Sequence, residues 1–164
     1  MNNTRILQIE SLTMDLLKDI YTNTTIIPPI DLEKVVKKSD IEVRVVNFEN
    51  PDIEGIYNRS EKVIYVKDST AYPRVAFTIA HELGHYYLHQ DKPAEVFYRN
   101  DALFLNPDHK EQEQEANWFA ASLLMPKEIF IDFWQIINDI DQIASRFSVS
   151  NSAAYWRLKN LGLV

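Results

Sequence analysis

The residues best suited to chemistry are two histidines and a glutamate in the run His81-Glu82-Leu83-Gly84-His85. Histidines four residues apart project from one face of a helix, where both imidazoles can bind one tetrahedral metal ion. Glu82 would then stand beside the ion and take a proton from metal-bound water, whose pKa falls to about 7. The spacing therefore predicts a hydrolytic metal site, with His81 and His85 as ligands and Glu82 as general base.

A hydrolytic site of this kind needs a third protein ligand and keeps the fourth position open for water. His89 continues the four-residue series. On an unbroken helix, however, it lies about 12 Å along the axis from His81, which is too far for both to bind one ion. We therefore interpret His89 either as a residue that supports a ligand or an oxyanion, or as a helix-end histidine packed beside Tyr86.

A carboxylate in the acidic helix expected at residues 110–124 is a better third ligand. Glu113 shares a helix face with Asn117 and with apolar residues expected to pack inward. Glu115 points about 200° away from Glu113 and, like Glu111, is expected to be a solvated residue at a helix start. The helical phase thus predicts Glu113 as the third ligand and Asn117 as a side chain that hydrogen-bonds a ligand.

The segments 76–89 and 113–126 together resemble the ImmA/IrrE-type metallopeptidases, which are small intracellular zincins. The resemblance extends to the leading helices, the strand-rich region and residues 143–163, so it covers most of the chain. It implies that zinc is the cofactor and that the three ligands and the general base hold the roles given above. It also implies a substrate class, because the family cleaves, or provokes cleavage of, helix-turn-helix repressors and antitoxins.

Further polar residues lie in the irregular stretch expected at residues 90–109. Tyr98, Arg99 and His109 are candidates for stabilising a tetrahedral oxyanion during peptide hydrolysis. The two-histidine, one-glutamate donor set favours Zn²⁺, while Mn²⁺ and Fe²⁺ remain alternatives.

Hydrophobic periodicity predicts the elements that must position these residues. Helices are expected at residues 4–21 and 31–38, from Pro73 through the histidine motif, and at 110–124, 127–137, 140–147 and 151–160. Strands are expected at residues 41–48, 53–57 and 62–67, with a hairpin turn at 58–61. Partial alternation of apolar and charged residues predicts an antiparallel meander with one wet face. The predicted fold class is α+β: a minimal zincin with a small three-stranded antiparallel sheet, an HExxH helix and a helical C-terminal tail.

The chain is expected to form a single domain overall. Residues 1–138 are predicted to be the zincin-like metallopeptidase core, and residues 139–164 a helix-turn-helix-like tail packed on it. Within the tail, Trp156 is expected to be a buried core residue, whereas Arg157 and Lys159 are expected to be exposed.

Composition excludes several function classes. The 164 residues carry a net charge of −7 and contain neither cysteine nor a glycine-rich nucleotide motif, so disulfides, thiolate metal sites and P-loop chemistry have no support. The first 20 residues carry acidic side chains where a signal peptide would be apolar, and no apolar run is long enough to span a membrane. We expect a cytoplasmic protein that binds neither membrane nor nucleic acid directly.

The prediction is therefore a zinc endopeptidase whose substrate, a repressor or antitoxin, lies extended along an exposed edge of the sheet. One alternative is a non-catalytic, metal-bearing module that captures a repressor or toxin partner. Another is a DNA-binding regulator, but residues 139–164 hold only 3 basic and 2 acidic side chains, and phosphate contacts need clustered Lys and Arg. The oligomeric state is left open.

Overall fold

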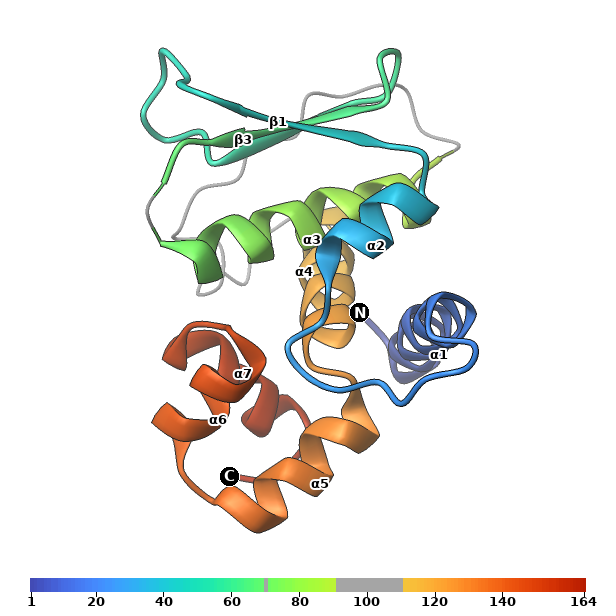
Figure 1. Cartoon of the computed structure of the whole chain (residues 1–164), viewed down its shortest axis with the longest axis vertical. Coiled ribbons are helices and arrows are strands. Elements are labelled where there is room, and N and C mark those ends of the chain that lie inside the picture. Colours follow the sequence, from blue (N-terminus) through green and yellow to red (C-terminus); the bar gives the residue numbers. More distant parts are fainter. Residues whose placement is uncertain (70, 91–110) are drawn as a thin grey trace.

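The computed structural model describes residues 1–69, 71–90 and 111–164. The helices are α1 (Asn3–Ile20), α2 (Leu32–Lys38), α3 (Tyr72–Leu88), α4 (Glu111–Leu124), α5 (Lys127–Ile137), α6 (Ile140–Phe147) and α7 (Asn151–Asn160), and the strands are β1 (Glu42–Val46), β2 (Gly55–Asn58) and β3 (Val63–Lys67). The small sheet lies over α3 at one end of the molecule, and α5 to α7 lie at the other (Figure 1). The predicted α+β class is thus observed, mostly helical. None of the helices in the three described ranges is long and apolar enough to cross a membrane.

The sheet is mixed, so the predicted antiparallel meander is wrong. β3 is the central strand; β2 pairs with it antiparallel across the expected hairpin turn, and β1 pairs with it parallel. Alternation of apolar and charged residues indicates that one face of the sheet is exposed to water. The same alternation occurs in parallel and in antiparallel strands, so it does not predict strand direction. The direction of β1 depends on the connection through residues 47–54, which carries the chain to the other side of β3. As a result β1 and β2 form opposite edges.

Helix α1 is capped by its own sequence and packs on α4. The Asn2 side chain accepts a hydrogen bond from the Arg5 backbone N–H at 2.8 Å, which satisfies a donor of the first turn. Ile9, Thr13 and Leu17 follow at four-residue spacing and are buried, so one face of the helix turns inward. The N-terminus lies beside α4 (Figure 1).

The two helices that carry the candidate ligands, α3 and α4, touch at a glycine. Pro73 lies in the first turn of α3. A backbone N–H has no helical partner there, so the N–H that proline lacks is not missed, and the fixed φ of proline suits the helix. A Cβ atom at Gly84 would lie 2.9 Å from the Cα of Ala116 and 3.2 Å from the Cβ of Phe119. Gly84 therefore permits a backbone-to-backbone approach that any larger residue would prevent.

The tail helices begin at side-chain caps. Asp139 caps α6 by accepting from the Gln142 N–H, and Ser150 caps α7 by accepting from the Ala153 N–H. Residue Ser148 between them adopts φ 53°, in the left-handed region. A division of the chain at residue 138 stays a prediction.

Of Arg157 and Trp156 in α7, Arg157 is the fully buried one, so the expectation for this pair was wrong. Arg157 is 1 % exposed, whereas Trp156 is only partly buried. Nη1 and Nη2 of Arg157 donate to the Glu10 carboxylate at 2.6 and 2.9 Å, and Nε of Arg157 donates to the Met125 carbonyl at 3.0 Å. The inward face of α7 is formed by Ala153, Ala154, Arg157 and Leu158. A charge can be buried on this face because Glu10 of α1 neutralises it.

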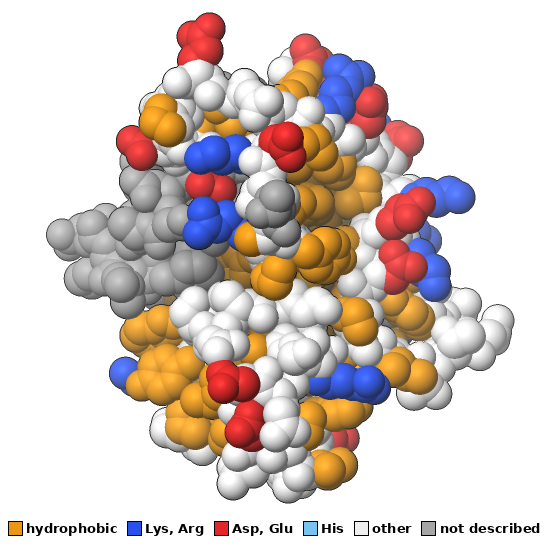
Figure 2. All heavy atoms as spheres, turned by 60° about the vertical axis from the view of Figure 1, so that its left-hand side comes forward, with side chains coloured by type: hydrophobic (Ala, Val, Ile, Leu, Met, Phe, Trp, Pro, Cys, Tyr) orange, Lys and Arg blue, Asp and Glu red, His pale blue; other side chains and the backbone are white. Residues whose placement is uncertain are grey.

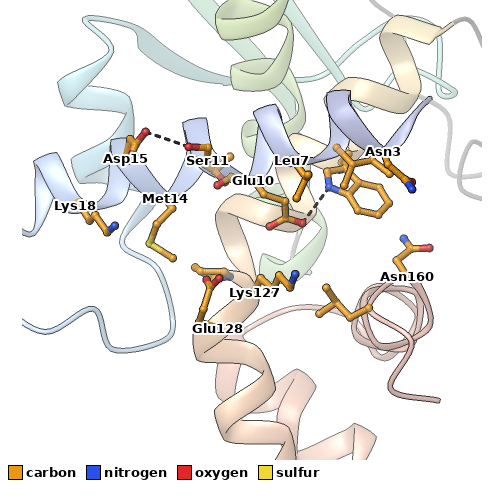
Figure 3. Close-up of a pocket in the computed structure, with 15 residues that line it drawn as sticks. Asn3, Leu7, Glu10, Ser11, Met14, Asp15, Lys18, Lys127, Glu128 and Asn160 are labelled. Atoms are coloured by element: carbon orange, nitrogen blue, oxygen red, sulfur yellow. Dashed lines mark hydrogen bonds between the residues drawn. The ribbon is translucent and has the colours of Figure 1, made fainter.

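A cavity of about 670 Å³ lies between α1 and the start of α5 (Figure 3). Leu7, Glu10 and Met14 line one side, and Lys127 and Glu128 lie opposite. Glu10 also accepts a hydrogen bond from the Trp118 indole N–H at 3.1 Å. None of the lining residues belongs to the histidine motif, so this cavity is separate from the candidate metal site.

Candidate metal centre

Helix α3 places both histidines of the motif in the interior. His81, Glu82 and His85 are all fully buried, and the four-residue spacing turns the two imidazoles toward each other. The Nε2 atoms of His81 and His85 are 3.0 Å apart. This is the arrangement that the sequence predicts for two ligands of one ion.

Glu113 completes the cluster from the first turn of α4. One carboxylate oxygen lies 3.2 Å from His81 Nε2 and the other 3.3 Å from His85 Nε2. The three ligand atoms lie within 4.8 Å of one another, and the cluster is one that could hold a metal ion. Two imidazoles and a carboxylate form a donor set typical of hydrolytic zinc sites.

The charges in this cluster suit a cation. Burial lowers the pKa of His85 to about 4, although its hydrogen bond to Glu113 opposes the shift, so the imidazole is neutral at pH 7. Burial raises the pKa of Glu113, but the hydrogen bonds with His81 and His85 outweigh it and the net pKa is lowered. The neutral imidazole of His85 and the carboxylate of Glu113 thus face the same point, in the protonation states that metal ligands require.

Glu82 lies between the histidines in sequence and against the sheet in space. A Cβ atom at Gly55 of β2 would be 3.2 Å from Glu82 Oε1 and would collide with Cγ2 of Thr78. The carboxylate is therefore packed beside an edge strand, and the absence of a side chain at Gly55 leaves room for it.

Asn117 lies where the helical phase predicts, one turn after Glu113. Its Oδ1 is 2.9 Å from Nδ1 of His81. An amide oxygen accepts only, so His81 donates through Nδ1 and its Nε2 keeps a lone pair for a metal. The contact agrees with the predicted role of Asn117.

His89 also lies near the cluster, but one helical turn away from the ligand atoms. Its Nδ1 is 3.1 Å from Nδ1 of His85, and its Nε2 is 3.1 Å from Oε2 of Glu115. The Arg59 guanidinium donates to the His89 carbonyl at 2.6 Å. His89 thus contacts His85, a candidate ligand, and the carboxylate of Glu115. These two contacts favour the supporting role of His89 over packing beside Tyr86.

Glu115 is not solvated, so that expectation was wrong. It is 8 % exposed and accepts two hydrogen bonds from Arg5, each of 2.7 Å. The hydrogen bond with Arg5 is the main reason that the pKa of Glu115 is lowered. Glu115 does point away from Glu113, but α1 and His89 occupy that side. Glu111 is exposed, as predicted.

Sequence reasoning missed Arg5 and Glu115 as neighbours of the site. They are 110 residues apart, so no local pattern links them. The signal present in the sequence was the position of Glu115 on the same expected helix, two residues after Glu113. Tyr98, Arg99 and His109 lie outside the described residues.

The family model for the IrrE N-terminal-like domain, Peptidase M78, matches residues 36–159. The chain belongs to this family. The resemblance to ImmA/IrrE-type metallopeptidases is thereby confirmed. The match contains α3 and α4, and hence the whole M78 candidate metal cluster, but leaves α1 outside.

Comparison with curated proteins gives no significant match. Among solved structures, a Mycobacterium tuberculosis transcriptional regulator is similar to this M78 chain, with a TM-score of 0.65 and 18 % sequence identity. The alignment covers 97 % of this chain and 48 % of the regulator, so the chain spans about half the length of that protein. At this identity the likeness concerns the fold alone.

Proposed function

We propose that the protein is a zinc-dependent endopeptidase that cleaves a regulatory protein. The observation that carries the proposal is the meeting of His81, His85 and Glu113 at one buried point, with Glu82 on the same helix. Membership of the Peptidase M78 family supports the reaction class. Mn²⁺ and Fe²⁺ are the other ions that this donor set would accept.

The residues present fit zinc, because both imidazoles turn Nε2 toward the Glu113 carboxylate. Zinc bound there supplies a Lewis acid that polarises a peptide carbonyl and acidifies water. Glu82 acts as general base: it takes a proton from the attacking water and delivers it to the leaving nitrogen. His81 is oriented by Asn117, which keeps its ligand atom turned inward.

The substrate would lie extended along β2. This strand is an edge of the sheet, and Gly55 places its backbone against the Glu82 carboxylate. A peptide added to that edge would pair with backbone groups and present a carbonyl in a fixed register. Strand β1 pairs with the other side of β3 and forms the opposite edge of the sheet.

A helix-turn-helix repressor or antitoxin in the cytoplasm is the substrate class we favour, from the family resemblance. Direct binding of the chain to DNA has little support. On the face that Figure 2 shows, acidic and basic side chains are interspersed and form no continuous basic patch. The net charge of −7 also opposes attraction to phosphate.

The test is incubation of the zinc-loaded protein with helix-turn-helix repressors and antitoxins from the same genome, followed by intact-mass spectrometry. The expected result is a pair of fragments whose masses sum to that of the substrate plus one water. Glu82→Gln should keep the metal and slow cleavage by roughly 10²–10⁴. If wild type and Glu82→Gln both bind the substrate tightly and neither produces fragments, the non-catalytic binding module is favoured instead.

A further inference from the structure

Helix α1 reaches the surroundings of the metal cluster through one charged side chain. Nε and Nη2 of Arg5 donate to the two carboxylate oxygens of Glu115, each at 2.7 Å. A bidentate pair of this kind fixes the orientation of a carboxylate as well as its charge. Arg5 lies outside residues 36–159, the part of the chain that matches the family.

Glu115 in turn contacts His89, which contacts His85. Its Oε2 is 3.1 Å from His89 Nε2, and His89 Nδ1 is 3.1 Å from His85 Nδ1. His85 and His89 are 0 % and 3 % exposed. An unbroken line of polar contacts therefore runs from α1 to a candidate metal ligand.

When His85 binds a metal through Nε2, the protons along this line of contacts can have only one order. The proton of His85 must then lie on Nδ1, from which it is donated to His89 Nδ1. His89 accepts there, so its own proton lies on Nε2 and is donated to the Glu115 carboxylate. Glu115 in turn accepts from Arg5. Each group in the line sets the tautomer or orientation of the next.

We propose that Arg5, Glu115 and His89 are positioning residues that hold the His85 imidazole in its ligating orientation, so that α1 is part of the metal site. This inference rests on metal binding by the proposed ligand set and is independent of whether the protein cleaves a peptide. Loss of Arg5 would leave the Glu115 carboxylate buried without its strongest partner, and the orientation of His89 and then His85 would be released.

A purely structural role, in which Arg5 only docks α1 on α4, is the competing explanation. The chain offers a matched control, because α1 carries a second ion pair. Glu10 binds Arg157 through two hydrogen bonds and also accepts from Trp118. Glu10→Gln therefore weakens the docking of α1 without touching the line that leads to His85.

The experiment compares Arg5→Met, Glu115→Ala and Glu10→Gln in the full chain. Zinc affinity is measured by competition with a chromophoric chelator, the Co²⁺ absorption spectrum reports ligand geometry, and thermal unfolding of the metal-free proteins reports stability. We expect Arg5→Met and Glu115→Ala to weaken zinc binding by about 10–100-fold and to alter the Co²⁺ spectrum. Glu10→Gln should lower the unfolding temperature with no change in zinc affinity.

Equal zinc affinity in all three variants, or an equal loss in Glu10→Gln, would overturn the inference. Wild-type protein that binds no zinc would overturn the ligand assignment itself. A second measurement needs no variant: in zinc-loaded wild type, ¹⁵N NMR of the imidazoles should show His89 protonated on Nε2 and His85 on Nδ1. Protonation of His89 on Nδ1 would contradict the proposed order even if Arg5→Met fails to fold.

Discussion

Oδ1 of Asn117 lies 2.9 Å from Nδ1 of His81, and this contact joins the helix that carries Glu113 to the helix that carries both histidines. The amide oxygen holds the His81 proton on Nδ1 and leaves Nε2 for a metal. Asn117→Ala should therefore weaken zinc affinity by about 10–100-fold with little loss of fold. The measurement is chelator competition, with Asn160→Ala at an exposed position as the control. Unchanged affinity in Asn117→Ala would remove it from the site.

The acidic start of α4 provides a direct test of ligand identity. Glu113→Ala removes one of three donors and should abolish stoichiometric zinc binding, since hydrolytic zinc sites use three protein ligands. Glu111→Ala removes an exposed carboxylate two residues earlier and should leave metal content unchanged. Metal analysis of the purified variants decides between them; a full complement of zinc in Glu113→Ala would refute the assignment.

Gly55→Ala separates metal binding from turnover. The new Cβ would collide with Thr78 and lie 3.2 Å from Glu82 Oε1, so the general base should be displaced while the ligands stay in place. We expect cleavage to slow by about 10², the usual effect of small misplacements in a site, with zinc content unchanged. Ile56→Val, whose side chain points to the other face of the sheet, is the control. Normal activity in Gly55→Ala would place Glu82 away from the reaction.

The buried pair of Arg157 and Glu10 makes a stability prediction. Arg157→Met leaves the Glu10 carboxylate without its charge partner and should destabilise the protein by about 3–5 kcal/mol. Lys159→Met, two residues later on the exposed side of α7, should change stability little. Chemical denaturation of both variants tests this. Equal stability of the two would show that the ion pair contributes nothing in solution.

Tyr87 predicts a loss of stability at alkaline pH. Burial is the main cause of its raised pKa, and its hydroxyl lies 2.7 Å from Ser39 Oγ. The phenol ionises more readily in the unfolded chain, so stability is unaffected below the unfolded pKa near 10 and falls as pH rises through the higher folded pKa. Unfolding midpoints between pH 8 and 11 should therefore fall less steeply in Tyr87→Phe. Parallel curves for wild type and variant would exclude Tyr87 as the cause.

Local patterns were enough to predict the helices and the candidate ligands. His81 and His85 are a single helical turn apart, and Glu113 and Asn117 repeat that spacing on the next long helix. The period of 3.6 residues decides which side chains share a face. Each pair could therefore be assigned to one face before any tertiary contact was known.

Contacts between distant segments could not be predicted in the same way. The parallel pairing of β1 with β3 depends on the path of a connection, not on the pattern within either strand. The burial of Glu115 and Arg157 depends on partners in α1 that are 110 and 147 residues away. Both were expected at the surface because an isolated charge is costly to bury. In each case α1 supplies the opposite charge.

The separation of Glu10 and Arg157 also bears on how the protein is completed during synthesis. A chain grows from its N-terminus at roughly 5–20 residues per second, so the 147 residues between the two side chains take about 7–30 s to translate. Through that interval the nascent protein exposes α1 without its contact to the tail. Both histidines and Glu113 emerge before Arg157 does. Helix α1 can therefore pack on α4 before its ion pair with the tail forms.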